Sequence, residues 1–237
     1  MAASSVLHTP GVNRLLELLD RDTQETLLPR MERVHLRRGD RIYRANQPIA
    51  DVHFPLSGMV SLVVTMEDGL VVEVGTVGNE GMTAVPLLHG ADSATVDAMS
   101  QVDGDAMRMA AADFARALAE NRGFAGILNR YAEAFLAQVA QSTACNRLHP
   151  VEQRLARWLL MTRDRLSSDT LPLTQEFLAQ MLGVRRASVN VVAGMLQRAG
   201  FIRYTRGMIH VLDLEGLESA SCECYMIVRR HFERLLS

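Results

Sequence analysis

The chain has 237 residues, of which 48% are hydrophobic and 22% charged, a composition typical of a globular protein with room for two domains. Its three cysteines are too few for a disulfide framework, which argues against a small secreted scaffold. No stretch approaches the ~20 apolar residues of a membrane-spanning helix, and the N-terminus lacks the pattern of a signal peptide. We therefore expect a soluble, cytoplasmic protein without a membrane partner.

The charge is distributed unevenly along the chain. The net charge is −2, yet residues 150–212 hold nine arginines against four acidic residues, a local charge of +5. Residues 1–149 hold 13 arginines against 18 acidic residues, a local charge of −5. Because a phosphate backbone attracts positive charge, the pattern predicts an acidic sensor half followed by a basic half that binds nucleic acid.

Short apolar runs separated by turn residues characterise residues 34–109. The runs lie at 34–36, 41–43, 52–54, 60–66, 70–77, 96–99 and 106–109. Many short strands at a spacing of about 8–12 residues predict a β-sandwich or β-barrel. Short helices are predicted before it, at 12–19 and 23–28, and after it, at 113–118.

A long helix is predicted from about Gly123 to Cys145. At 1.5 Å per residue it would be ~35 Å long, more than one face of a small barrel requires. Apolar residues recur at alternating three- and four-residue steps, the pattern of a coiled-coil seam. The predicted seam consists of Phe124, Ile127, Tyr131, Ala134 and Gln138, continued by Gln141. We expect this helix to form a dimer interface and residues 146–149 to form a hinge; a helix buried in its own subunit is the alternative.

A helix-turn-helix pattern occupies residues 174–199. Thr174 stands at the N-cap position of the first helix, and Gly183 closes that helix where a positive φ is required. The second helix is predicted to begin near Arg185 and to end at Gly200. Two short helices joined by a tight turn suit insertion into a major groove, and an ordinary helical hairpin in a core is the alternative.

A β-hairpin is predicted directly after the two helices. Strands at 201–204 and 208–211 alternate in polarity around the two-residue turn Arg206-Gly207. A helix around Trp158 precedes the helix-turn-helix. Together these elements predict a winged helix-turn-helix over residues 150–212.

This order of elements resembles the cyclic-AMP receptor protein and Fnr (Crp/Fnr) family of bacterial transcription regulators. The resemblance covers about residues 15–212 and is carried by the turns RRGD, LSGMV and MEDG, by GNEGM at 78–82, and by TQEFLAQMLGVRRASVNVVAGMLQRAGFI. It implies an α+β fold with a cyclic-nucleotide-binding-like β-roll, a long dimerisation helix and a C-terminal winged helix-turn-helix, here with an extra C-terminal helix. The expected divisions are 1–120, 121–146, 150–212 and 213–237.

The resemblance also implies DNA contacts. A homodimer would read a near-palindromic operator in double-stranded DNA with two recognition helices ~34 Å apart, and RNA polymerase would be a further partner. Arg186 falls on the position of the family's arginine that reads a G·C pair. Ala187 replaces the glutamate usual in the family, so a different half-site is expected. By the same resemblance, base contacts and phosphate contacts are expected from Arg185, Ser188, Asn190, Thr174, Gln175 and Arg206.

The expected effector positions depart from those of cyclic-nucleotide binders. A gap-free comparison from Gly81 places Met82, Asp92 and Ser93 where the family has its glutamate and the Arg-Ser pair that binds the cyclic phosphate. A carboxylate at that position would repel the phosphate. Val139 and Ala140 replace the Thr-Ser pair that contacts adenine. We therefore expect no cyclic-AMP binding and either an unidentified small-molecule effector or none.

The cysteines do not predict a cofactor. An Fnr-type iron–sulfur cluster needs several N-terminal cysteines, and the first here is Cys145. Cys222 and Cys224 would point to different faces of a helix at 214–236, with His231 as the nearby third ligand, and two thiolates do not complete a zinc site. We predict no metal. For Cys145 a buried hydrophobic role is expected, with a sensor thiol as the alternative.

Two functions of other classes compete with transcription regulation. One is a cupin-like metal enzyme fused to a DNA-binding module, which would need clustered His-x-His ligands that the strand region lacks. The other is a dimeric protein-interaction scaffold, which would show no salt-dependent affinity for DNA. We expect neither an enzyme nor catalytic residues.

Overall fold

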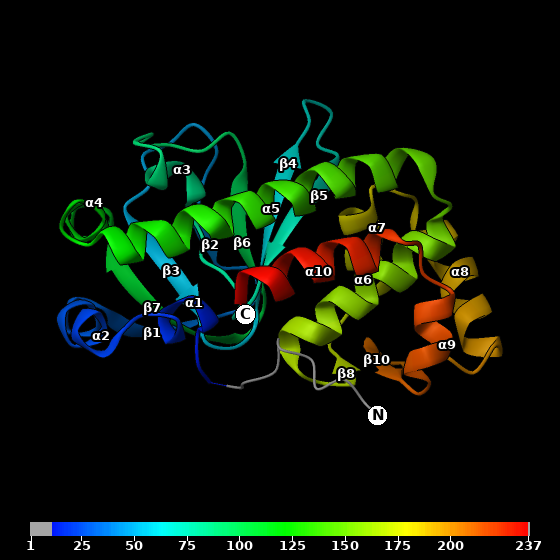
Figure 1. Ribbon diagram of the computed structural model, residues 1–237. Coiled ribbons are helices and arrows are strands. Elements are labelled where there is room, and N and C mark those ends of the chain that lie inside the picture. The colour runs from blue at the N-terminus through cyan, green and yellow to red at the C-terminus, as the bar shows by residue number, and fades with distance from the viewer. Residues whose placement is uncertain (1–10, 237) are drawn as a thin grey trace.

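The computed structural model describes residues 11–236, so the outer ends of the expected 1–120 and 213–237 divisions lie outside the described residues. The chain forms a strand-rich half and a helical half, and one long helix runs along both (Figure 1). This arrangement confirms the predicted α+β fold and its order of domains.

Two antiparallel sheets make up the strand-rich half. One has the order β1-β7-β3 and the other β2-β6-β4-β5, which confirms the strands predicted between residues 34 and 109. The strands are β1 (Glu32–Leu36), β2 (Arg41–Tyr43), β3 (Asp51–Pro55), β4 (Met59–Thr65), β5 (Val71–Val77), β6 (Asp97–Val102) and β7 (Gly104–Ala110). Short helical segments surround them: α1 (Arg14–Glu17), α2 (Arg21–Leu27), η1 (Leu28–Arg30), α3 (Val85–Leu88), which was not predicted, and α4 (Ala111–Glu120).

The long helix is α5 (Arg122–Leu148), and its first turn is capped by the Asn121 side chain, which accepts a hydrogen bond from the Phe124 N–H at 2.8 Å. Tyr131 anchors its middle to the β-roll, because its hydroxyl donates to the Met82 carbonyl at 2.9 Å. The close approach requires glycine at position 81, where a Cβ would lie 2.5 Å from the Tyr131 hydroxyl.

The predicted dimer seam of α5 is not a free surface. All five of its main members are buried within a single chain: Phe124, Ile127, Tyr131, Ala134 and Gln138. Phe124 packs against the Phe114 ring of α4, Tyr131 against the Phe232 ring of the C-terminal helix, and Gln138 donates to a carbonyl of β5. A three- and four-residue repeat marks a buried helix face, but it does not tell whether a second chain or the same chain buries it.

The helical half confirms the winged helix-turn-helix. It contains α6 (Val151–Leu166), β8 (Thr170–Leu171), α7 (Gln175–Leu182), α8 (Arg186–Arg198), β9 (Ile202–Thr205) and β10 (Met208–Val211). The wing is a small sheet of order β8-β10-β9, with β8 an unpredicted addition. The hinge is shorter than predicted, because α5 continues through Leu148 and Pro150 already caps α6, which leaves His149 and Pro150 as the connection.

The C-terminal extension is two helices, where one helix over 214–236 was predicted. They are α9 (Leu214–Ser219) and α10 (Cys224–Leu236). After the break, α10 returns along α5 toward the strand-rich half (Figure 1). The Phe232 ring of α10 lies 6.4 Å from the Tyr131 ring of α5. Helix α10 therefore covers part of the α5 face that the periodicity assigned to a dimer.

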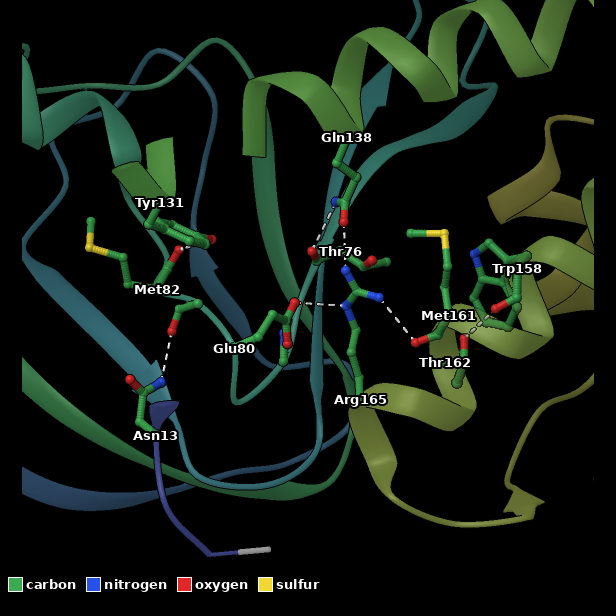
Figure 2. Close-up of polar contacts among 12 residues, drawn as sticks. Asn13, Thr76, Glu80, Met82, Tyr131, Gln138, Trp158, Met161, Thr162 and Arg165 are labelled. Atoms are coloured by element: carbon green, nitrogen blue, oxygen red, sulfur yellow. Dashed lines mark hydrogen bonds and ion pairs between the residues drawn. The ribbon is translucent and has the colours of Figure 1, made fainter. Parts of the chain in front are cut away.

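A buried polar network joins the two halves (Figure 2). Arg165 of α6 forms an ion pair with Glu80 of the β-roll at 2.9 Å and donates to the Gln138 side chain at 2.5 Å. Gln138 in turn donates to the Thr76 carbonyl at 3.0 Å. The Arg165 and Glu80 side chains are only 6% and 3% exposed, so each charge depends on the other for its stabilisation.

A second buried contact crosses the same interface. The Trp158 indole N–H of α6 donates to Glu73 of β5 at 2.7 Å, and the Ser61 hydroxyl donates to the other Glu73 oxygen at 2.6 Å. Burial raises the pKa of Glu73 to about 7, against the opposing effect of these two hydrogen bonds. The carboxyl therefore changes charge near neutral pH.

Candidate DNA interface and effector cavity

Local interactions set the geometry of α7 and α8, the two helices of the helix-turn-helix. The Thr174 hydroxyl accepts a hydrogen bond from the Phe177 N–H at 3.2 Å and so caps α7 as predicted. Gly183 has φ +61° and ends that helix in the left-handed conformation. On α8, Val189, Val192 and Leu196 are buried, and this packing directs the opposite face outward.

The residues predicted to contact DNA lie on neighbouring surfaces. On α8 and its N-cap, Arg185, Arg186 and Asn190 are exposed and Ser188 is half-buried. The Gln175 amide of α7 donates to the Asn190 side chain of α8 at 3.2 Å, which links the first turns of the two helices. Gly207 in the wing turn lies beside Thr174, since a Cβ there would be 3.5 Å from the Thr174 methyl group, and the adjacent Arg206 is exposed. The contacts themselves stay predictions.

Tyr204 and Val191 are two residues of this surface that the sequence reasoning missed. Tyr204 of β9 is half-buried: burial raises its pKa, while a backbone hydrogen bond of Gln175 and the charge of Arg186 lower it. Val191 is 62% exposed on α8. The sequence could have identified Val191, because it lies outside the apolar stripe of α8 that contains Val192. An apolar residue at such a position does not pack within the domain.

A cavity of about 540 Å³ lies between the β-roll and α5. Its walls are mainly apolar and include Leu62, Val96, Phe135 and Leu136. The cavity is in the size range of small-molecule sites. Glu133 contributes a carboxylate to the lining, which contains no arginine or lysine.

Of the predicted effector residues, only Val139 lines this cavity. Met82 is fully buried beneath Tyr131, and Ala140 is exposed on α5. The Asp92 carbonyl accepts a hydrogen bond from the Ile49 N–H, Ser93 forms an isolated bridge with Pro48, and neither residue lines the cavity. Four of the five residues that the gap-free comparison gave therefore lie outside the lining of this cavity, and their role in effector binding stays a prediction.

The free face of α5 is a different stripe from the predicted seam. Leu136 is 67% exposed at its centre, and the stripe continues at alternating three- and four-residue steps. Its members are exposed or half-buried: Asn129, Ala132, Leu136, Val139 and Thr143. Most residues of this stripe are small or polar, so its repeat of three- and four-residue steps is not recognised when only large apolar side chains are considered.

The structure also brings together the cysteines that were predicted to lie apart. Cys145, His149, Cys222 and Cys224 form a compact group of side chains of the types that can ligate a metal, and the prediction of no metal stays untested. The break between α9 and α10 is the reason, because Cys222 precedes α10 and does not share one continuous helix with Cys224. His231, the ligand considered from sequence, lies elsewhere, beside Arg130 and Glu133.

Within residues 11–236, no helix combines the length and the hydropathy that crossing a bilayer requires.

Two family models match the chain. A cyclic nucleotide-binding domain matches residues 33–121, and a Crp-like helix-turn-helix domain matches residues 153–220. Among curated proteins, no sequence matches the chain significantly.

Solved structures share this fold over about four fifths of the chain. TTHB099, a CRP-family transcriptional regulator from Thermus thermophilus, is 20% identical with a TM-score of 0.68 over 79% of this chain and 96% of that chain. FixK2 from Bradyrhizobium japonicum is 16% identical with a TM-score of 0.68 over 81% and 98%. CLP from Xanthomonas campestris, a c-di-GMP responsive global regulator, is 16% identical with a TM-score of 0.65 over 81% and 99%. At such identities the likeness shows the fold, and the two family models, matched in order on one chain, show that it belongs to the Crp/Fnr family of transcription regulators.

Proposed function

We propose that the protein is a homodimeric regulator that reads a near-palindromic operator through α8 and contacts RNA polymerase at the promoter. The observation that supports this most directly is the exposed surface formed by the first turns of α7 and α8 and the wing turn. Its guanidinium groups at positions 185, 186 and 206 match the chemistry of bases and phosphates. Arg186 reads guanine, and the exposed Val191 side chain contacts a thymine methyl group.

Selection of bound sequences from a random duplex library tests this proposal. The wild type should enrich a two-fold-symmetric motif, and R186A should lose discrimination at one base pair per half-site. R198A is the matched control, because it removes the same charge from the far end of α8 and should leave the motif unchanged. A scaffold would enrich no motif, and its DNA affinity would not depend on salt.

The proposed dimer interface is the free stripe of α5 centred on Leu136. Apolar and small residues at alternating three- and four-residue steps allow two α5 helices to pack closely. L136E should shift the dimer toward monomer in sedimentation or light scattering. L148E is the control, because Leu148 is 75% exposed on the same helix but lies off the stripe. Equal dimerisation of L136E and L148E would show that the dimer interface lies elsewhere.

We propose that cyclic AMP is not the effector and that the cavity beside α5 accepts a largely apolar small molecule. The lining offers the carboxylate of Glu133 and neither an arginine nor a lysine to a cyclic phosphate. Saturating cyclic AMP should leave the operator affinity unchanged. A motif that appears only with cyclic AMP would contradict this part of the proposal.

The regulatory step is a movement of the DNA-binding domain against the β-roll about His149 and Pro150. Contacts that such a movement would alter include the Arg165–Glu80 ion pair and the packing of Val72 beside Gly183. Conditions that favour one arrangement shift the population of dimers competent for DNA. No observation favours the cupin-like enzyme, because the one group of potential metal ligands found within residues 11–236 lies outside the β-roll.

A further inference from the structure

Three cysteines and one histidine from distant parts of the chain meet where α5 joins α6. Cys145 lies near the end of α5 and His149 in the connection to α6, whereas Cys222 and Cys224 come from the segment that joins α9 to α10. Their ligand atoms all lie within 4.8 Å of one another. These are all the cysteines of the chain, and each is at most 4% exposed.

The distances suit one tetrahedral ion. Cys145 Sγ lies 3.5 Å from Cys222 Sγ, and Cys224 Sγ lies 3.5 Å from His149 Nδ1. Zinc bonds of about 2.3 Å to sulfur and about 2.0 Å to nitrogen require separations of about 3.8 Å between two sulfurs and about 3.6 Å between sulfur and nitrogen. The four protein ligands of an iron–sulfur cluster are divided between at least two iron atoms and stand farther apart as a set, so this compact group fits a single ion.

The surroundings complete the site. His149 Nε2 lies 3.4 Å from a Glu223 carboxylate oxygen, an arrangement that orients the imidazole so that Nδ1 faces the thiols. The Gln141 amide donates to Cys224 Sγ at 3.1 Å. The neighbouring groups therefore orient one ligand and provide a hydrogen-bond donor to another.

We propose that Cys145, His149, Cys222 and Cys224 bind one Zn²⁺ ion in a tetrahedral site. On binding, the three thiols release three protons to solvent, the thiolates and the neutral imidazole each donate an electron pair to the metal, and no electron is transferred. The complex carries one net negative charge, which Arg157 partly neutralises. The edge of His149, whose side chain is 18% exposed, provides the path of entry.

The position of the site gives it a structural role. It fastens the start of α10 to the end of α5, next to the connection about which the DNA-binding domain moves. Helix α10 buries Tyr225, Val228 and Phe232 against the rest of the protein, so loss of the metal would loosen the packing of α10 on α5. Metal binding therefore stabilises the arrangement of the two halves.

Metal content and cobalt spectroscopy of the full-length protein test the proposal. Protein purified under reducing conditions should contain about one zinc ion per chain. After chelation, titration with Co²⁺ should give thiolate-to-cobalt charge-transfer bands and the intense visible bands of tetrahedral cobalt, and Zn²⁺ should displace them. Chelation should lower the Tm of the wild type and Zn²⁺ should restore it, a readout that needs no variant to fold.

Two histidine variants provide the matched comparison. H149A should lower the affinity for Zn²⁺ about 10–100-fold or more, whereas H231A should bind like the wild type, because His231 lies outside the group. C222S should lose the tetrahedral cobalt spectrum. Equal affinities of H149A and H231A, a Co²⁺ spectrum without thiolate bands, bound iron with sulfide, or a metal-free Cys145–Cys222 disulfide would each overturn the proposal.

Discussion

Helix α8 and helix α5 are both partly exposed, but they present their free faces in opposite ways. On α8 the buried stripe packs into one small domain, and its polar face remains outward with Arg186 available to a ligand. On α5 the larger apolar side chains are used within the subunit, and the free stripe consists mainly of small residues around Leu136. The exposed face of a helix within one small domain can therefore be predicted from its own residues. The exposed face of a helix between domains depends on which other elements pack against it.

The largest effect is expected where α6 meets the β-roll, because this contact holds the two halves in one arrangement. R165A leaves Glu80 charged and buried, and it should lower the free energy of unfolding by about 3–5 kcal/mol in urea denaturation. Replacing both residues by methionine should recover most of that loss. If R165A and the double variant are equally unstable, lost packing would be the cause and the ion pair would contribute little.

A pH-dependent effect is expected at Glu73. Burial raises the pKa of this carboxyl from 4.5 to about 7, so the folded state keeps a proton that the unfolded state loses between these values. The contribution of Glu73 to stability is therefore greatest below about pH 4.5, falls as the pH rises to about 7, and is constant above. Relative to the wild type, E73Q should gain up to about 3 kcal/mol above pH 7 and converge with it near pH 4.5. Parallel unfolding profiles of the two proteins would refute the shifted pKa.

The buried face of α5 should respond differently from its free face. Y131F removes the hydroxyl that donates to the Met82 carbonyl and should cost about 1–3 kcal/mol of stability, because that buried carbonyl loses its partner. It should leave the dimer equilibrium unchanged, whereas L136E should act mainly on assembly. A Y131F variant that dissociates into folded monomers would show that the buried stripe of α5, and not the free stripe around Leu136, forms the dimer interface.

The smallest effect is expected in the wing. R206A removes a phosphate contact, so it should weaken binding to all sequences alike and reduce the slope of log affinity against log salt by about 1. R186A, by contrast, should cost about 1–3 kcal/mol at one base pair. Quantitative binding at several salt concentrations to matched and mismatched operators separates the two outcomes. A sequence-dependent loss in R206A would show that the wing reads bases.

Residues 174–211 show which structural features can be predicted from residues close together in the sequence. The Thr174 cap, the positive φ of Gly183 and the Arg206-Gly207 turn are each determined by a few neighbouring residues, and the structure has all three where they were predicted. The strands of the β-roll were predicted for the same reason, since alternation and turn chemistry act over short distances. Periodicity likewise placed α5 to within a few residues of its ends.

The sequence by itself determined the order of elements, the winged helix-turn-helix and the basic surface on it, because caps, turns and helical stripes depend on residues close in the chain. The tertiary structure alone decided which face of α5 is free, which residues line the cavity beside that helix and where the cysteines lie. Cys145 and Cys222 are 77 positions apart, and the break before α10 brings them together. Such contacts depend on the path of the chain between them, which no local pattern encodes.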